Sequence, residues 1–238
     1  MCWNQEISLS IAGAGYIGAY YLKKKTKDPY CWSPILFFAS MELLQGLTYF
    51  VINDCQNPAN RLLTYLSYLH ICFQPIFSNI FFMYFLTKEK RMKVIKWVMP
   101  ISVLSTVLVL QKLYIYEGCG SCHPEEIFCS DKVCSYFGTW HIGWELILND
   151  NSFYTPEWLN KLYPGKIVLL SPHFISMFLL PLFYGEIGLV VFLFITGPYF
   201  AMSVTNDKNE WASIWCLFST TQMSIMLFAT RIKHKYLM

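Results

Sequence analysis

The sequence predicts an all-α membrane protein, a bundle of seven transmembrane helices in a single domain over residues 1–238. Three observations predict this class: an apolar composition, seven apolar segments, and basic residues that gather on one side of them. The chain is 55% hydrophobic and only 14% charged, whereas a soluble domain is typically about 25% charged. Its mean hydropathy is +0.38. A soluble protein of this composition would expose large apolar patches, so we expect the lipid bilayer as a partner and no nucleic acid.

Seven apolar segments run along the chain, and several reach the roughly 20 residues that a helix needs to cross the hydrocarbon core. They are residues 8–22, 33–53, 62–86, 94–113, 166–183, 187–204 and 211–229. The first segment is short and rich in Gly and Ala. Only Tyr184-Gly185-Glu186 separates the fifth segment from the sixth, which predicts a tight helical hairpin.

The basic residues predict the orientation of the bundle. Twelve of the eighteen Lys and Arg fall on one side of a seven-span arrangement, within residues 23–27, 88–96 and 231–235. Because cytoplasmic loops carry an excess of Lys and Arg, we expect the N-terminus outside and the C-terminus in the cytoplasm. The expected location is a membrane of the secretory pathway, the plasma membrane or a viral envelope.

The longest connection, residues 114–165 between the fourth and fifth segments, contains the stretch CGSCHPEEIFCSDKVC. In the predicted orientation this loop lies outside the cytoplasm, where cysteines form disulfides. We therefore expect a disulfide-rich outer loop, with fifteen possible pairings of six cysteines. The six are Cys2, Cys55, Cys119, Cys122, Cys129 and Cys134. A zinc site with His123 is the alternative, but the second C-x-x-C of a zinc ribbon is missing, so no metal is expected.

Aromatic side chains in the same loop suit the headgroup region of a bilayer. Trp140, Trp144 and Trp158 are examples. The loop is then either a disulfide-bonded cap that lies on the bilayer or a lid over a pocket, because loops of this length are often functional.

A glycine pattern in the first segment resembles a dinucleotide-binding motif. Gly13-Ala-Gly15-Tyr-Ile-Gly18 matches G-x-G-x-x-G, but that motif requires a preceding strand in a βαβ unit. Here the pattern opens an apolar segment, so we interpret the glycines as a surface for close helix packing.

Polar residues inside the predicted spans mark the candidate site. Glu42 is the only acidic residue within a span, and an intramembrane carboxylate is costly unless it is paired, protonated or facing water. A pair of Glu42 with His70 or with His173 could relay protons, bind a ligand or act as acid and base. The candidate ligand-binding or proton-relay residues are Glu42, Gln45, His70, Gln74, His173 and Gln222.

Three functions remain open for this polar core. The favoured one is binding or translocation of a small polar or amphipathic molecule. The second is an intramembrane lipid-modifying enzyme that uses Glu42 and a histidine as acid and base. The third is a receptor-like or structural protein whose polar groups only hold the bundle together. No cofactor is expected, because the last segment lacks the lysine that a retinal Schiff base needs.

Four short stretches together carry a resemblance. They are MCW at Met1–Trp3, MELLQ at Met41–Gln45, FQPIFSN at Phe73–Asn79 and WHIGWEL at residues 140–146. With these stretches the chain resembles an uncharacterised family of seven-helix proteins encoded by giant DNA viruses and some eukaryotes. The resemblance implies a multi-pass membrane protein and carries over no activity or site.

Overall fold

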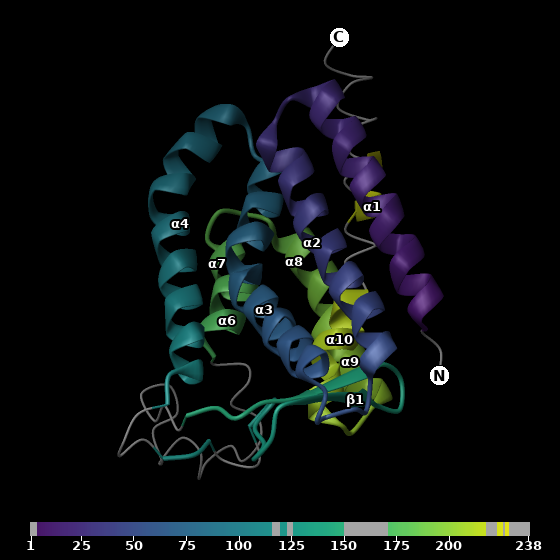
Figure 1. Ribbon diagram of the computed structural model, residues 1–238. Helices are drawn as coiled ribbons and strands as arrows, with labels where there is room; N and C mark the ends of the chain where they lie inside the picture. The colour runs from purple at the N-terminus through teal and green to yellow at the C-terminus, as the bar shows by residue number, and fades with distance from the viewer. Residues whose placement is uncertain are drawn as a thin grey trace.

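The computed structural model describes residues 4–115, 120–122, 126–149, 171–217, 223–225 and 227–228. Within these residues the chain is mostly helical, and the helices form a bundle with one two-stranded sheet across one end (Figure 1). The all-α prediction is wrong at this end. There β1 (Cys134–Phe137) pairs antiparallel with β2 (Ile142–Glu145).

The first half of the chain folds into four long helices, each begun by a polar side chain that accepts a hydrogen bond from a backbone N–H. Such caps satisfy amide groups that have no partner within the helix. The helices are α1 (Gln5–Thr26), α2 (Pro29–Thr48), α3 (Pro58–Tyr84) and α4 (Lys88–Leu110), with caps Asn4, Asp28, Asn57 and Thr87. Short 3₁₀ turns extend α2 as η1 (Tyr49–Val51) and α4 as η2 (Gln111–Leu113).

The second half contains shorter helices joined by π-helical turns. In order, these are α6 (Pro172–Phe174), η4 (Ile175–Leu179), α7 (Leu180–Leu182), α8 (Ile187–Phe194), η5 (Ile195–Tyr199), α9 (Phe200–Val204), η6 (Lys208–Glu210) and α10 (Trp211–Leu217). Pro181 and Pro198 lie next to or within the π turns. A proline lacks the N–H that an α-helix needs and clashes with the preceding turn, so the helix widens there.

The predicted tight hairpin between the fifth and sixth segments is confirmed. α7 ends at Leu182 and α8 begins at Ile187. Gly185 between them has a φ of +97°, a backbone conformation that favours glycine.

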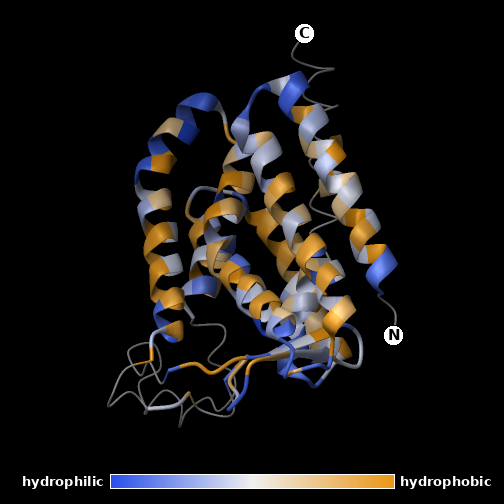
Figure 2. Ribbon diagram, viewed as in Figure 1, coloured by the Kyte–Doolittle hydropathy of each residue, from blue (hydrophilic) through white to orange (hydrophobic). Residues whose placement is uncertain are grey.

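Four helices in the described part of the chain are long and apolar enough to cross a membrane. They are Pro29–Val51, Pro58–Tyr84, Lys88–Leu113 and Ile187–Val204, and they match the second, third, fourth and sixth predicted segments. Pro172–Leu182 is a shorter apolar helix within the fifth segment. Figure 2 shows the apolar residues along the middle of the bundle and hydrophilic residues at the helix ends.

α1 coincides with the first predicted segment and packs along α2 through small residues. A Cβ atom placed on Gly15 would lie 2.5 Å from the Cβ of Ala39, so only glycine allows this approach. Among the described residues, nothing lies within 4 Å of a Cβ placed on Gly13 or Gly18. The packing interpretation of the glycine pattern is therefore confirmed at Gly15, and the described residues give it no support at the other two positions.

Two disulfides hold the segment that contains the sheet. Cys55 is bonded to Cys134, and Cys122 to Cys129, which confirms disulfide bonding for four of the six predicted cysteines. Cys2 and Cys119 lie outside the described residues. Because Cys122, Cys129 and Cys134 each take part in a disulfide, their sulfurs cannot serve as the thiolates of a zinc site.

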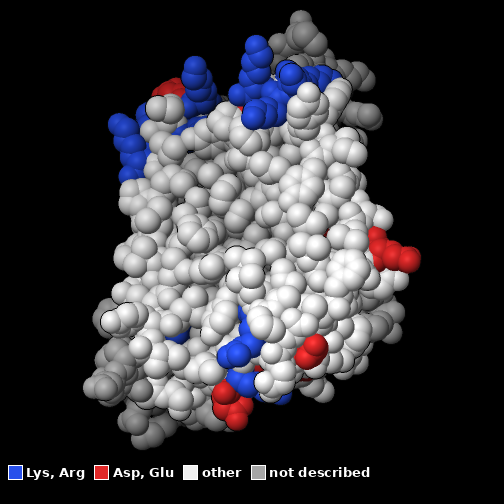
Figure 3. Space-filling model, in the orientation of Figure 1, with Lys and Arg blue, Asp and Glu red and all other residues white. Residues whose placement is uncertain are grey.

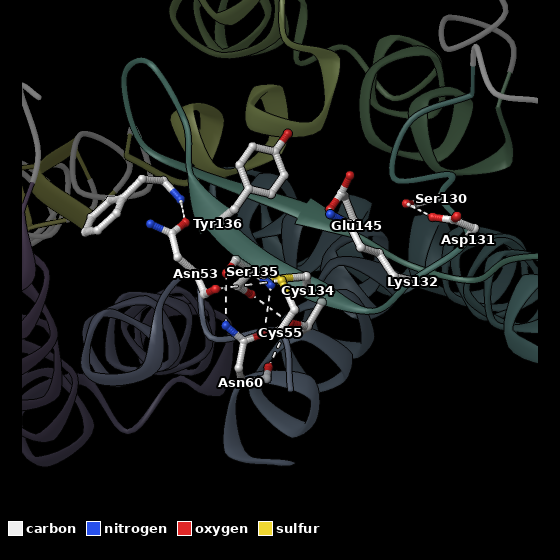
Figure 4. Close-up of polar contacts among 12 residues, drawn as sticks. Asn53, Cys55, Asn60, Ser130, Asp131, Lys132, Cys134, Ser135, Tyr136 and Glu145 are labelled. Atoms are coloured by element: carbon white, nitrogen blue, oxygen red, sulfur yellow. Dashed lines mark hydrogen bonds and ion pairs between the residues drawn. A yellow bond between two sulfur atoms is a disulfide. The ribbon is translucent and has the colours of Figure 1, made fainter. Parts of the chain in front are cut away.

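The Cys55–Cys134 disulfide lies beside a network of hydrogen bonds that fixes β1 to the start of α3 (Figure 4). The Nδ2 of Asn60 donates to Val51 O at 2.8 Å and to Ser135 O at 2.9 Å, and Ser135 N donates back to Asn60 Oδ1 at 2.9 Å. Asn60 and Ser135 are fully buried. The hairpin of β1 and β2, called the outer hairpin below, is thus an integral part of the bundle.

The opposite end of the bundle is basic. Figure 3 shows Lys and Arg gathered where α1 ends and α4 begins, above a wide belt with few charges. Arg91 at this end donates to Asp28 Oδ2 at 3.0 Å and to Met83 O at 3.0 Å. This ion pair links the start of α2 to the turn between α3 and α4.

Candidate functional site

Two fully buried polar side chains lie in the second half of α2. Glu42 and Gln45 are both 0% exposed, and residues three apart share one face of a helix. That face is directed toward the outer hairpin, because Gln45 contacts a histidine from it.

This histidine is His141, which lies immediately before β2. Its Nε2 is 2.8 Å from Gln45 Oε1, and its Nδ1 is 2.8 Å from the hydroxyl of Tyr49. Because a carbonyl oxygen only accepts, Nε2 carries a proton. Burial lowers the pKa of His141 from 6.5 to about 3, so the imidazole is neutral at neutral pH. Its Nδ1 then has no proton and accepts from the Tyr49 hydroxyl.

Glu210 holds the turn that carries His141. Its carboxylate is fully buried and accepts from the backbone N–H groups of Thr139 and Trp140. A Cβ atom at Gly138 would collide with this carboxylate, so the turn requires glycine there. Burial raises the pKa of Glu210, and the two N–H donors oppose that effect.

Glu42 connects this group to two further helices. It interacts electrostatically with Tyr49 and with Cys216 of α10. The sulfur of Cys216 in turn accepts from Gln74 Nε2 of α3 at 3.4 Å. We name these residues the Glu42 cluster: Glu42, Gln45, Tyr49, Gln74, His141 and Cys216. It joins α2, α3, α10 and the outer hairpin.

The structure gives His70 and His173 backbone carbonyls as partners in place of the expected Glu42. His70 Nε2 bonds Phe37 O at 2.7 Å, and its ring stacks on Phe37 with centroids 3.8 Å apart. His173 Nε2 bonds Ile71 O at 3.1 Å. That carbonyl would pair with the amide of residue 75 in an α-helix, but residue 75 is Pro75 and has no N–H. Pro75 thus leaves Ile71 O without a backbone donor, and His173 Nε2 donates to it instead.

A second buried polar group, the Asn79 cluster, ties α3, α4 and the helix of α6, η4 and α7 together. Asn79 Nδ2 lies 3.1 Å from Ser102 Oγ and 2.9 Å from Ser176 O, and Asn79 Oδ1 accepts from the Tyr184 hydroxyl at 2.8 Å. In the π-helical register Ser176 O would pair with the amide of residue 181, which is a proline. Asn79 supplies the missing donor.

Several buried polar atoms have no hydrogen-bond partner among the described residues. They include Gln45 Nε2, Ser67 Oγ and His70 Nδ1, on the two helices that carry most of the predicted site. Buried polar groups are normally hydrogen-bonded, and each exception calls for an unseen water, ion or ligand. Gln222, the remaining predicted residue, lies outside the described part of the chain.

The sequence prediction missed His141, Tyr49 and Asn79. Tyr49 lies four residues after Gln45, so helical spacing could have placed it on the same face. Asn79 donates to Ser176 O, the carbonyl that Pro181 leaves free, but the two residues are 97 apart in sequence, so no local signal indicates this contact. His141 is far from α2 in sequence, and no local signal indicates its contact.

Within the described residues, no group of three or more His, Cys, Asp or Glu is arranged to hold a metal ion. The site therefore consists of a buried carboxylate, amides, a phenol, a thiol and a neutral imidazole beneath a disulfide-bonded hairpin. Fold and site together define a helical protein with membrane-length apolar helices and two disulfides.

The chain belongs to a family of unknown function, DUF5765, whose sequence profile matches residues 6–237. Neither the curated proteins nor the solved structures contain a significant match to it. The resemblance to seven-helix proteins of giant DNA viruses stays a prediction.

Proposed function

We propose that the protein spans the membrane seven times, with the outer hairpin on the non-cytoplasmic side and the basic end in the cytoplasm. Support comes from four membrane-length helices and from the helices found in the described part of every predicted segment. The basic end and the disulfide-bonded end are opposite ends of the bundle (Figures 1 and 3). Disulfides persist in oxidising compartments, and basic residues favour the cytoplasmic side, so both features favour one orientation. A membrane of the secretory pathway, the plasma membrane or a viral envelope is the corresponding location.

Within this arrangement the protein binds or translocates a small polar or amphipathic molecule at the Glu42 cluster. The observation that carries this proposal is Gln45 Nε2, a fully buried donor in a membrane-length helix without a partner among the described residues. A ligand that accepts a hydrogen bond from this amide would complete the cluster. Glu42 is the anchoring group, and Gln74 orients the ligand from α3.

The outer hairpin closes the site in this proposal. His141 is hydrogen-bonded to Gln45 Oε1 and to the Tyr49 hydroxyl. The first bond fixes the orientation of the Gln45 amide, so that Gln45 Nε2 can donate to a ligand. The sequence left open whether this loop is a cap on the bilayer or a lid over a pocket. In this proposal the outer hairpin is both, because it covers the end of the bundle and contributes the side chain of His141 to the site. The sequence predicted that His70 and His173 exchange protons with Glu42. His141, the histidine of this site, does not take over that role, because its imidazole is neutral.

A ligand screen tests the proposal. The purified protein is melted in the presence of small amines, amino acids, sugars and short-chain lipids, since a ligand that binds only the folded state raises the melting temperature. We expect at least one class to stabilise the wild type and to lose its effect in Gln45→Leu. Stabilisation that is equal in the wild type and in Gln45→Leu would contradict the proposed site.

A further inference from the structure

An open hollow of about 590 Å³ lies on the outward face of α4 at the basic end of the bundle. It is lined by Lys88, Glu89, Met92, Lys93 and Lys96. All five side chains are exposed. Lys88, Met92 and Lys96 are four residues apart, so they form one row along the helix.

The hollow carries uncompensated positive charge. Lys93 Nζ pairs with Glu89 Oε1 at 2.8 Å, which balances the one carboxylate of the lining. Lys88 and Lys96 have no ion pair with any described residue. Two ammonium groups thus flank Met92, which is 56% exposed.

The same side of α4 continues into apolar surface. Val103 and Val107 are each 46% exposed. They follow Lys96 by seven and eleven residues, close to two and three helical turns, so they lie on the same side of α4 as the hollow. Lysines at the end of a helix, followed by exposed apolar residues on the same side, are the order that a membrane interface selects from headgroup to hydrocarbon.

We propose that this hollow binds one anionic phospholipid. The phosphate-bearing headgroup lies between Lys88 and Lys96, and an acyl chain follows Met92 and the exposed side chains of Val103 and Val107. The apolar continuation favours a lipid over a free phosphate ion, because a free ion would gain nothing from it. The proposal rests on the membrane orientation given above and is independent of the Glu42 cluster.

Native mass spectrometry of the full chain in detergent tests the site. The probes are short-chain phosphatidylserine, short-chain phosphatidylcholine and inorganic phosphate. We expect phosphatidylserine to bind in preference to the other two. In the double variant Lys88→Gln, Lys96→Gln its affinity falls roughly tenfold or more, because each lysine near an anionic headgroup contributes about fivefold.

The matched control is the double variant Lys23→Gln, Lys24→Gln. It removes the same charge from the same end of the molecule, but from the exposed end of α1. This control keeps wild-type affinity if the hollow is a defined site. An equal loss in both double variants would overturn the proposal in favour of general surface charge. Equal binding of inorganic phosphate would overturn it in favour of a free-anion site, and no preference for phosphatidylserine would overturn it outright.

Discussion

The two buried polar clusters of this bundle differ in how completely they are satisfied. Every polar atom of the Asn79 side chain has a partner, supplied by α3, α4 and the proline-widened helix that contains Ser176. The Glu42 cluster includes Gln45 Nε2, which lacks one among the described residues. A saturated network rigidifies a core, whereas an incomplete one is costly unless something else completes it.

The clusters also differ in what builds them. The Asn79 cluster consists of helical residues and the adjoining Tyr184. Asn79 donates to Ser176 O, the carbonyl that Pro181 leaves without a backbone donor. The Glu42 cluster needs a residue of the outer hairpin, which two disulfides and Glu210 hold in place. This contrast supports the proposal that the second cluster is the functional one, while the first cluster holds the bundle together.

The largest expected effect comes from the disulfide that holds the outer hairpin. The double variant Cys55→Ser, Cys134→Ser opens a loop with a sequence separation of 79, which costs about 4 kcal/mol in the loop-entropy model. The matched variant Cys122→Ser, Cys129→Ser opens a separation of only 7 and should cost about 2 kcal/mol. Chemical denaturation in detergent measures both values. Equal losses would show that the hairpin does not depend on the longer link.

Asn79→Ala should destabilise the protein by about 3 kcal/mol, because it leaves the Ser176 carbonyl and the Tyr184 hydroxyl buried without their partner. Tyr184→Phe removes only one donor and should cost about 1 kcal/mol. Denaturation midpoints of the two variants give the comparison. A neutral Asn79→Ala would refute the structural role of this cluster.

His141 makes stability depend on pH. Its folded-state pKa of about 3 lies below the ordinary value of 6.5, so the unfolded chain binds the proton more readily. Stability is therefore full above pH 6.5 and falls as the pH drops toward 3, by about 1.4 kcal/mol for each pH unit. His141→Gln should remove this part of the slope. Unfolding curves of both proteins between these limits measure it, and identical slopes would exclude a buried neutral imidazole.

The smallest expected effects are changes in stability when a buried serine is replaced by alanine, compared between a hydroxyl with hydrogen-bond partners and one without them. Ser67 Oγ is buried and has no partner among the described residues, so Ser67→Ala should leave stability unchanged or raise it by up to about 1 kcal/mol. Ser102 Oγ accepts from Asn79 Nδ2 at 3.1 Å and donates to Val98 O at 2.9 Å, so Ser102→Ala should cost about 1 kcal/mol. The reverse order would contradict the contrast between the two clusters.

The sequence predicted the features that depend on local composition. Apolar length placed helices at the predicted segments, and cysteine chemistry indicated disulfides without their pairing. The outer hairpin escaped prediction, because its strands of four residues each are too short for a periodic signal. The partner of Gln45 also escaped prediction, since His141 is separated from it by 96 residues. His70 and His173 were misassigned because carbonyls of α2 and α3 accept from them, an effect of helix packing.

The most direct test of the account uses Glu42→Gln in the melting screen, with the ligand class that stabilises the wild type. The account predicts that the variant without ligand keeps the melting temperature of the wild type within a few degrees and loses the stabilisation by that ligand. Unchanged stabilisation by the ligand, together with a loss of stability as large as that of Asn79→Ala, would contradict it, because Glu42 would then serve only to hold the bundle together.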